Sequence, residues 1–292
     1  MVEIVSKIKP LKLGLPKGRM ESGVLTLLSD AGIEVQSSDR DYRPLVSLAN
    51  AVAKSMKPQN IVEMIALGRR DVGFAGADWV KELGADVVEI LDTRLDSVRL
   101  VAAAPPEIAA NGSLSDGRLI VTSEYVRIAQ TWIRDKNIDA DFVRSYGATE
   151  VFPPEDADII IDNTATGATL RANRLTIIDT IMSSSTRLFA SKAAMADTEK
   201  RDRIEALGLV LKSVLEARRR VMIEINASSD RLDAVIALLP CMREATVAPL
   251  FGDAGFAVRA AVPRSDLPTL LPEVKAAGGT DIVVSSVDQI VP

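Results

Sequence analysis

The sequence predicts an α/β protein that ends in a smaller ferredoxin-like domain. Over most of the chain, short apolar runs that stop at glycine or proline alternate with helical patterns. This alternation is typical of a sheet covered by helices on both faces. In the last part, about residues 217–292, one strand–helix–strand pattern occurs twice. The resulting order, βαββαβ, is that of a ferredoxin-like domain.

In the first part of the chain, glycine and proline residues mark the ends of the predicted strands and helices. A strand at Leu11–Pro16 leads into a basic turn, and a helix then runs from Ser22 to a stop at Gly32. A glycine-ended run, Asp71–Gly76, predicts a second buried strand, after which Asp78 could start a helix. Two further strands are predicted at 87–92 and 99–105.

A second series of strands and helices begins near Gly117. Its long apolar-faced helix at 126–138 and its proline-containing loop at 149–158 separate the predicted strands. Residues 176–191 hold two strand-like runs, and a long amphipathic helix with charges of both signs follows at 198–220. The strands of this part are predicted at 117–123, at 140–147 and from Ile159 onward.

The C-terminal part is a weak internal repeat. Each copy has a strand, a Ser-Asp turn and a helix with apolar residues at i, i+3, i+4 and i+7, which is one helical face. A strand follows each helix, at 245–251 and at 281–287. The two matching apolar sets are Leu232, Val235, Ile236 and Leu239, and Leu267, Leu270, Leu271 and Val274.

Composition excludes several classes of function. The length of 292 residues suits two or three domains, and the net charge of −5 argues against a nucleic-acid partner. The single cysteine, Cys241, permits neither an internal disulfide nor a cysteine metal site. Because the chain has no histidine, its chemistry must use carboxylates, Lys, Arg, hydroxyls, backbone amides or a metal held by oxygen.

The sequence gives no sign of a membrane or export signal. Its first residues, "MVEIVSKIKPLKLGL", lack the continuous apolar segment of a signal peptide. No window holds the roughly 18 uninterrupted apolar residues of a membrane-spanning helix. We therefore expect a cytoplasmic protein without a membrane partner.

The stretch "IIIDNTATGATLRAN", Ile159–Asn173, is the first candidate site. An apolar strand ends at Asp162, and a run of small and hydroxyl-bearing residues follows. Such a turn lets backbone N–H groups approach a phosphate, while the carboxylate could bind sugar hydroxyls. The alternative is a polar turn that caps a helix.

Three other stretches could carry chemistry. Lys17 and Arg19 flank a glycine after the first strand and suit a phosphate or pyrophosphate, although a solvated basic turn has the same composition. Gly73 and Gly76 allow close backbone approach before Asp78, as a binding wall or as a tight strand-to-helix turn. Glu150 is a loop carboxylate, and most such groups are simply solvated.

Together these stretches resemble the long form of the ATP phosphoribosyltransferase family, the first enzyme of histidine biosynthesis. "LGLPKGRM" resembles the family's N-terminal strand and loop, "DVGFAGADW" its "DLGITGxD" signature, and "VTSEYV" its "ATxYP" segment. "EVFPPEDADIIIDNTATGATLRAN" resembles the phosphoribosyl-pyrophosphate segment "EVAP…ADAIxDLVSTGxTLxAN". "RLDAVIALLP", "TVAPL" and "VPRSDL" resemble the regulatory domain of the long form, so the resemblance covers nearly the whole chain.

The resemblance implies a two-lobed catalytic part of the periplasmic-binding-protein kind, with the site between the lobes. Lobe I would contain residues 1–103 and 187–216, lobe II residues 104–186, and a histidine-binding regulatory domain residues 217–292. The chain would cross between lobes near 101–105 and 184–187. The resemblance also implies a homo-hexamer built from dimers, and inhibition by histidine.

The implied reaction joins ATP to phosphoribosyl pyrophosphate, with Mg²⁺ held largely by substrate oxygens and water. The resemblance assigns catalysis to Lys17, Arg19, Glu150 and Asp162. ATP is expected at Lys17, Gly18, Arg19, Gly76 and Asp78. Phosphoribosyl pyrophosphate is expected at Asp162, Thr164, Ala165, Thr166, Gly167, Ala168 and Thr169. Regulatory histidine is expected at Asn226 and Thr246, which could equally be ordinary strand and loop residues.

The chain departs from the family pattern at two places. Asn163 and Thr164 replace two apolar residues of "DLVSTG", and Val126 and Arg127 stand where the family usually has Pro-Asn. Two rival functions remain. A non-catalytic two-lobed sensor could close on a small anion, and a nucleobase-salvage phosphoribosyltransferase has a similar Thr-Gly turn. The salvage enzymes usually have two adjacent acids before the turn and lack a βαββαβ tail.

Overall fold

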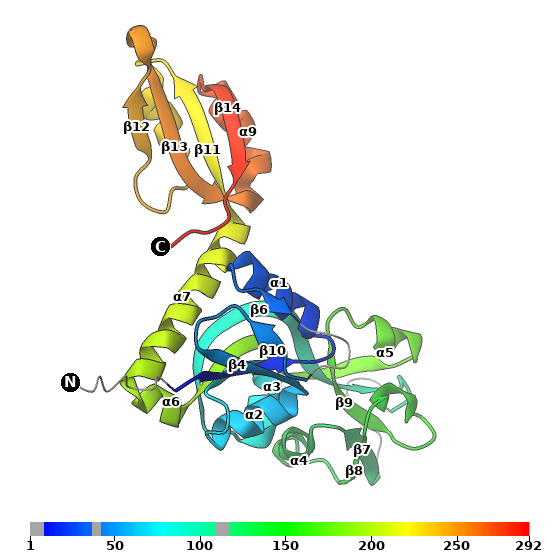
Figure 1. The fold of residues 1–292 in the computed structure, drawn as a ribbon. Helices are drawn as coiled ribbons and strands as arrows, with labels where there is room; N and C mark the ends of the chain where they lie inside the picture. Colours follow the sequence, from blue (N-terminus) through cyan, green and yellow to red (C-terminus); the bar gives the residue numbers. More distant parts are fainter. Residues whose placement is uncertain (1–8, 37–41, 109–116, 292) are drawn as a thin grey trace, which may run out of the picture. The chain divides into compact units, whose positions relative to one another are not determined.

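The computed structural model describes residues 9–36, 42–108 and 117–291. The chain forms two compact units (Figure 1). The first contains the chain up to Thr26 together with Ile33–Glu205, and the second contains Leu27–Gly32 together with the chain from Ala206 onward. None of the helices in these described ranges is long and apolar enough to cross a membrane.

A mixed sheet forms the centre of the first unit. Within the described residues it has eight strands in the order β4-β1-β5-β10-β6-β9-β7-β8. The strands β1, β4 and β5 are parallel to one another, as are β7, β8 and β9. The strands are β1 (Leu11–Pro16), β4 (Ala51–Met56), β5 (Val72–Gly76), β6 (Val87–Ala104), β7 (Leu119–Ser123), β8 (Ala140–Arg144), β9 (Ile159–Thr164) and β10 (Thr176–Ser191). A separate short pair joins β2 (Val35–Gln36) to β3 (Leu45–Val46).

Helices cover this sheet as the alternating sequence pattern predicts. On α2 (Pro58–Ala66), Ile61, Val62 and Ile65 are buried against β5 and the neighbouring helix α3 (Ala77–Leu83). The helix α4 (Val126–Asp135) buries Trp132 in a second cluster. The remaining helical segments are α1 (Glu21–Asp30), the 3-10 turn η2 (Thr149–Val151), α5 (Ala168–Ala172), α6 (Lys192–Ala196) and α7 (Thr198–Arg219), which continues into the second unit.

The helix expected at 126–138 ends three residues early. Its last helical residue is Asp135, and Asn137 adopts a left-handed φ of 53°. Asparagine tolerates this conformation better than most residues, so it terminates the helix much as glycine would. The strand β4 and the helix α2 are not among the expected elements. For β4 the reason is that "AVAKSM" has only a weak alternation.

Two pairs of expected strands are in fact two single long strands. The runs at 87–92 and 99–105 belong to β6, and both runs within 176–191 belong to β10. These two strands are antiparallel partners from Thr176 opposite Ala104 to Ser191 opposite Val87, with register shifts along the way. The polar residues that suggested breaks lie where β6 bends and the register shifts, so the pairing continues past them.

The three isoleucines of β9 are buried because helices cover both faces of the sheet. Ile159 and Ile161 pack in the cluster that contains Trp132, and Ile160 packs in the opposite cluster with Leu170 of α5. A strand covered on both faces has a continuous apolar run instead of an alternating one. The first half of β9 therefore lies in the core, and its polar end, from Asp162 onward, lies where the strand leaves the core.

The second unit has the predicted ferredoxin-like plan. Its antiparallel sheet has the order β12-β13-β11-β14, and the eight apolar residues of the internal repeat all belong to its core cluster. The helix α8 is shorter than expected and ends at Ile236. Its elements are β11 (Arg220–Ala227), α8 (Leu232–Ile236), β12 (Thr246–Pro249), η3 (Phe251–Asp253), β13 (Phe256–Pro263), η4 (Arg264–Asp266), α9 (Leu267–Ala276) and β14 (Thr280–Ser286).

The contact between β1 and β5 requires glycine. A Cβ at Gly73 would lie 2.8 Å from Ile61 Cγ2 and 2.9 Å from the carbonyl oxygen of Gly14. We predict that Gly73→Ala lowers the free energy of unfolding by about 1–3 kcal/mol, as overpacking does in other cores. Gly23→Ala is the control, because its Cβ would have no neighbour closer than 3.7 Å and alanine favours the helix. Urea unfolding of both variants checks this, and equal stability would contradict it.

Candidate functional site

Two basic residues follow the carboxyl end of β1. The backbone N–H of Lys17 donates to the carbonyl of Met56, and Gly18 adopts a φ of 83° that turns the chain towards α1. Lys17 Nζ lies 4.6 Å from the ring centroid of Tyr42. Arg19 Nη1 donates to Oδ1 of Asn163 at 3.0 Å, so this arginine reaches from the β1 loop to the end of β9.

The loop that follows β9 is shaped by its own hydroxyls. We call Thr164–Thr169 the threonine loop. Thr164 Oγ1 accepts a hydrogen bond from the Gly167 amide at 2.9 Å, and Thr166 Oγ1 accepts one from the Ala168 amide at 3.3 Å. Gly167 has a φ of 75°, which favours glycine, and α5 begins directly after it. Thr166 and Thr169 are exposed, so the loop presents hydroxyls and backbone to a ligand.

The threonine loop borders a cavity of about 240 Å³, the loop cavity. The loop cavity brings together most of the catalytic and phosphoribosyl residues expected from the sequence, although Gly167 itself does not line it. Asp162 and Glu150 both face it, so a strand end and the η2 turn supply two carboxylates to one space. Its lining consists of Arg19, Glu150, Asp162, Asn163, Thr164, Ala165, Thr166, Ala168, Thr169 and Leu170.

Asp162 has an unusual charge environment. Burial raises the pKa of this carboxyl to about 6, and the negative charges of Glu150 and Glu124 contribute to the rise. The backbone N–H of Asn163, which donates to Asp162 Oδ1 at 2.6 Å, and the charge of Arg19 oppose it. Asp162 is therefore an acceptor of hydrogen bonds at neutral pH that becomes protonated in mildly acidic solution.

A second cavity of about 330 Å³, the aromatic cavity, shares Arg19 and Asn163 with the loop cavity. Trp79 and Tyr125 stack with ring centroids 4.6 Å apart and form part of its wall. The cavity thus combines flat apolar surface with cations, which suits a base and its phosphates. Its lining consists of Lys17, Arg19, Met20, Lys57, Pro58, Gln59, Asp78, Trp79, Glu124, Tyr125 and Asn163.

Asp78 has a more internal position than the sequence suggests. Asp78 is 2% exposed. Its carboxylate accepts hydrogen bonds from Tyr125 Oη at 2.7 Å and from Ser184 Oγ at 2.9 Å. The N-cap of α3 is Gly76, so Asp78 does not start the helix. Gly76 does not line the aromatic cavity, but a Cβ there would lie 2.1 Å from Asp78 Oδ1. Glycine at 76 leaves room for the buried carboxylate.

A continuous series of hydrogen bonds connects the two cavities to β10. Asn163 accepts from Arg19 and donates through Nδ2 to Tyr125 Oη at 3.1 Å. Tyr125 donates in turn to Asp78, which Ser184 on β10 also holds. Burial, together with the charge of Asp78, raises the pKa of Tyr125, so the phenol stays protonated and donates. Asn163 stands where the family has an apolar residue, and its side chain links Arg19 to the buried Tyr125.

Sequence reasoning missed Tyr125, Trp79 and Lys57 as site residues. Trp79 directly follows Asp78, and Tyr125 lies in "VTSEYV" at the start of α4, so both lie in stretches that resemble motifs of the family. Their signal was weak because an aromatic residue beside a helix start is most often part of the core. The stacking of the two rings shows only after α3 and α4 pack together.

The other expected residues lie outside these cavities. The departure at Val126 and Arg127 is at the start of α4, where Glu82 accepts hydrogen bonds from the backbone amides of Arg127 and Ile128. In the second unit, Asn226 on β11 and Thr246 on β12 lie on opposite sides of β13, in adjacent rows of the same sheet face. Asn226 Nδ2 donates to Asp281 Oδ2 at 3.1 Å.

We predict that Tyr125→Phe lowers the free energy of unfolding by about 1–3 kcal/mol, because the buried Asp78 carboxylate loses a donor. Tyr146→Phe is the matched control, since Tyr146 is 84% exposed, and its change should stay within about 0.5 kcal/mol. Denaturant unfolding followed by circular dichroism measures both. A Tyr125→Phe variant as stable as the control would show that this hydrogen bond contributes nothing.

Comparison with known proteins agrees with this geometry. The family profile described as ATP phosphoribosyltransferase matches residues 57–213, and the profile described as "HisG, C-terminal domain" matches residues 217–289. The ATP phosphoribosyltransferase of Pelotomaculum thermopropionicum is 36% identical over 97% of this chain and 99% of its own length. The ATP phosphoribosyltransferase of Chlorobium phaeovibrioides is 35% identical over 96% of this chain and 97% of its own length.

A solved structure shares the fold. The ATP phosphoribosyl transferase (HisG:HisZ) complex from Thermotoga maritima contains a chain that matches 70% of this chain and 98% of its own length, with a TM-score of 0.62 and 24% identity. The first profile alone spans more than half of the chain, and the curated relatives align along nearly all of it. The chain belongs to the ATP phosphoribosyltransferase family.

Proposed function

We propose that the protein condenses ATP with 5-phosphoribosyl 1-pyrophosphate to give N1-(5-phosphoribosyl)-ATP and pyrophosphate, the first step of histidine biosynthesis. Membership of the family supports this activity. The observation that carries it is the meeting of Arg19, Asp162, Glu150 and the threonine loop at one cavity, with an aromatic cavity beside it.

The loop cavity suits the phosphoribosyl substrate. In this proposal the 5′-phosphate binds the turn from Thr166 to Thr169, where hydroxyls and backbone amides can reach an anion. Asp162 binds the ribose hydroxyls, and Glu150 binds a sugar hydroxyl from the opposite wall. Two carboxylates repel phosphate but accept hydrogen bonds from hydroxyls. Their shared cavity therefore favours the sugar, with the phosphate placed at the loop.

The aromatic cavity suits ATP. Trp79, which is half-buried and backed by the buried ring of Tyr125, offers aromatic surface to a purine, and Lys17 with Arg19 offers cations to its phosphates. Gly18 lets the basic turn approach the ligand. We assign Asp78 and Gly76 to ATP binding through Tyr125, since the carboxylate that Gly76 accommodates holds this ring in place.

The reaction itself needs little proton chemistry. The N1 lone pair of adenine forms a bond to the anomeric carbon while the bond from that carbon to pyrophosphate oxygen breaks. The attacking nitrogen is already unprotonated, so a chain without histidine can promote the step by alignment and by stabilising the departing anion. Arg19 lies at the junction of the two cavities, where both substrates meet.

Magnesium fits the donor set. Asp162 and Glu150 supply oxygen atoms at the loop cavity, and no group of three or more acidic or cysteine side chains suited to a metal occurs in the described part of the chain. Mg²⁺ commonly binds through one or two carboxylates and substrate phosphates. When bound, it would neutralise charge on the leaving pyrophosphate.

The second unit suits a regulatory role. We propose that residues 217–292 bind histidine near Asn226 and Thr246 and inhibit a catalytic part made of lobe I (1–103 and 187–216) and lobe II (104–186). The lobes join where the long strands β6 and β10 run, near 101–105 and 184–187. We further propose a cytoplasmic homo-hexamer built from dimers. The profile described as "HisG, C-terminal domain" matches residues 217–289, which supports treating this part as a separate domain of the family.

An assay of pyrophosphate release with ATP and phosphoribosyl pyrophosphate tests the activity. We expect release that histidine suppresses, and an Asp162→Ala variant that loses most turnover because the ribose loses its acceptor. Asp156→Ala removes the same charge from an exposed position and is the control. The rival function, a two-lobed anion sensor, predicts binding of phosphoribosyl pyrophosphate without release when ATP is added. If calorimetry detects no histidine binding, the regulatory role is wrong while the activity can stand.

The raised pKa of Asp162 predicts that the enzyme loses activity in acidic solution, as an acidic limb of its pH profile. The carboxylate form accepts the ribose hydroxyls, so kcat/KM for phosphoribosyl pyrophosphate should fall about tenfold for each pH unit below about 6. Glu150→Gln should move the limb to lower pH, because the charge of Glu150 helps to raise this pKa. Substrate phosphate also titrates near pH 6. A limb that Glu150→Gln leaves in place would therefore belong to the substrate.

A further inference from the structure

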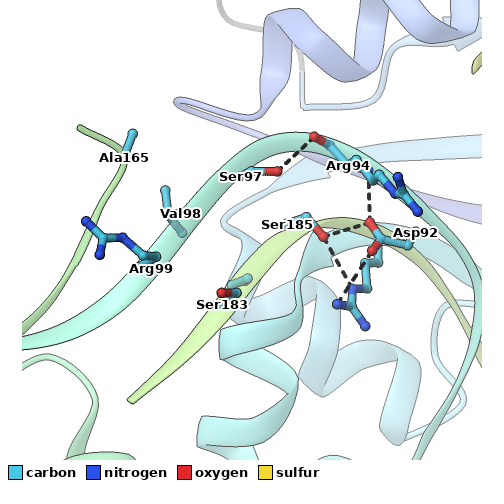
Figure 2. Close-up of a pocket in the computed structure, with 10 residues that line it drawn as sticks. Asp92, Arg94, Ser97, Val98, Arg99, Ala165, Ser183 and Ser185 are labelled. Atoms are coloured by element: carbon cyan, nitrogen blue, oxygen red, sulfur yellow. Dashed lines mark hydrogen bonds and ion pairs between the residues drawn. The ribbon is translucent and has the colours of Figure 1, made fainter. Parts of the chain in front are cut away.

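A third cavity, of about 410 Å³, lies on the long strands next to the threonine loop. Figure 2 shows it between the bend of β6 and the middle of β10, with Ala165 of the loop at one end. We call it the arginine cavity, because three arginines from two strands face it. Its lining consists of Asp92, Arg94, Ser97, Val98, Arg99, Ala165, Ser183, Ser184, Ser185 and Arg187.

The bend that forms the arginine cavity is a built feature of β6. Arg94 and Asp96 both have positive φ, 57° and 48°, which is uncommon for residues other than glycine. Thr186 Oγ1 donates to Asp96 Oδ2 at 2.9 Å, and Thr93 Oγ1 donates to the carbonyl of Thr186 at 2.5 Å. These two bonds between β6 and β10 hold a backbone conformation that would otherwise be unfavourable.

The one carboxylate of the cavity is already neutralised. Asp92 Oδ1 accepts hydrogen bonds from Ser185 Oγ at 2.7 Å and from the Arg94 amide at 2.9 Å, and Oδ2 lies 3.6 Å from Arg187 Nη2. Although burial opposes the change, the Ser185 hydrogen bond and the arginine charges lower the pKa of Asp92. Figure 2 shows this group turned towards Ser185, away from Arg99. Arg187 also donates to Glu89 Oε2 at 2.8 Å, so it is shared between two carboxylates, and Arg94 and Arg99 leave the lining of the cavity positive.

Of the three arginines that face the arginine cavity, Arg99 lies at the end next to the threonine loop; Arg171, whose Nη1 donates to the carbonyl of Thr166 at 2.9 Å, is committed to the loop itself. In the sheet Arg99 lies opposite Thr164 on β9 and opposite Ser183 on β10. Figure 2 shows its side chain beside Ala165. In the part of the chain that the structure describes, no hydrogen bond or ion pair engages its guanidinium group, which leaves the group available to a ligand.

The loop cavity, by contrast, lacks the charge for its proposed ligand. Arg19 is its only cation among the described lining residues, against the carboxylates of Asp162 and Glu150. Phosphoribosyl pyrophosphate and ATP each carry several negative charges, so part of this charge needs cations elsewhere. The arginine cavity shares Ala165 with the loop cavity and Ser184 with the hydrogen-bonded series that ends at the aromatic cavity.

We propose that the arginine cavity binds the polyphosphate chain of a substrate, with Arg99 as the main contact. The inference rests on the proposed function and deepens it. A planar guanidinium group binds phosphate oxygens in pairs, and the serine hydroxyls of β10 add neutral donors. The bound polyphosphate belongs either to ATP or to phosphoribosyl pyrophosphate, and released pyrophosphate has the same chemistry.

Titration calorimetry with Arg99→Gln tests the proposal. Pyrophosphate, ATP and phosphoribosyl pyrophosphate are each titrated with Mg²⁺ into wild type, Arg99→Gln and Arg134→Gln. The last variant removes an equal charge from an exposed position on α4 and controls for long-range electrostatics. We expect Kd for pyrophosphate to rise at least tenfold in Arg99→Gln only, as the loss of a charged hydrogen bond implies. Arg99→Lys should recover part of the affinity.

The three ligands distinguish between ATP and phosphoribosyl pyrophosphate as the source of the bound polyphosphate. Weaker binding of ATP alone, besides pyrophosphate, assigns the cavity to the triphosphate, and weaker binding of phosphoribosyl pyrophosphate alone assigns it to that substrate. Unchanged affinity for all three, relative to Arg134→Gln, overturns the proposal. A wild type that binds pyrophosphate through Arg99 but never releases it from the two substrates would refute the proposed activity and leave the cavity assignment intact.

Discussion

The first unit depends on the antiparallel pairing of β6 with β10. The two strands remain partners along their whole length, from Ala104 opposite Thr176 to Val87 opposite Ser191. β5 joins β10 on one side and β9 joins β6 on the other, so this pair connects the two parallel halves of the sheet. Asp162 lies opposite Val101 of β6, and Ser184 lies on β10. The pair of β6 and β10 therefore positions the residues around all three cavities.

Features with a local cause could be predicted from the sequence. The three isoleucines before Asp162 and the small residues after it predicted a buried strand and an open loop, because burial and turn chemistry act over a few residues. The internal repeat predicted the ferredoxin-like plan for the same reason. The continuity of β6 and β10 could not be predicted, since the bend at Arg94 and Asp96 is held by Thr186, which is far away in the sequence.

The site shows the same division between local and distant causes. Arg19, Asp162 and the threonine loop are recognisable as polar residues at strand ends. Asp78 has the same appearance in the sequence, but its carboxylate accepts hydrogen bonds from Tyr125 and Ser184 in the interior. Burial of a carboxylate requires partners, and these come from elements that the sequence does not align. A polar residue after a strand can thus face a ligand or the interior, and only packing decides which.

The hydrogen-bonded series from Arg19 to Ser184 has one weak member. The bonds among Tyr125, Asp78 and Ser184 are buried, so breaking any of them leaves a polar group without water. The bond from Arg19 to Asn163 is exposed, and water can replace either partner. If the β1 loop moves away from the end of β9 to admit substrates or to release product, the bond between these two side chains costs the least to break. Asn163 then stays with Tyr125, and Arg19 moves with the β1 loop, whereas a separation of the proposed lobes would also break the buried bond from Tyr125 to Asp78.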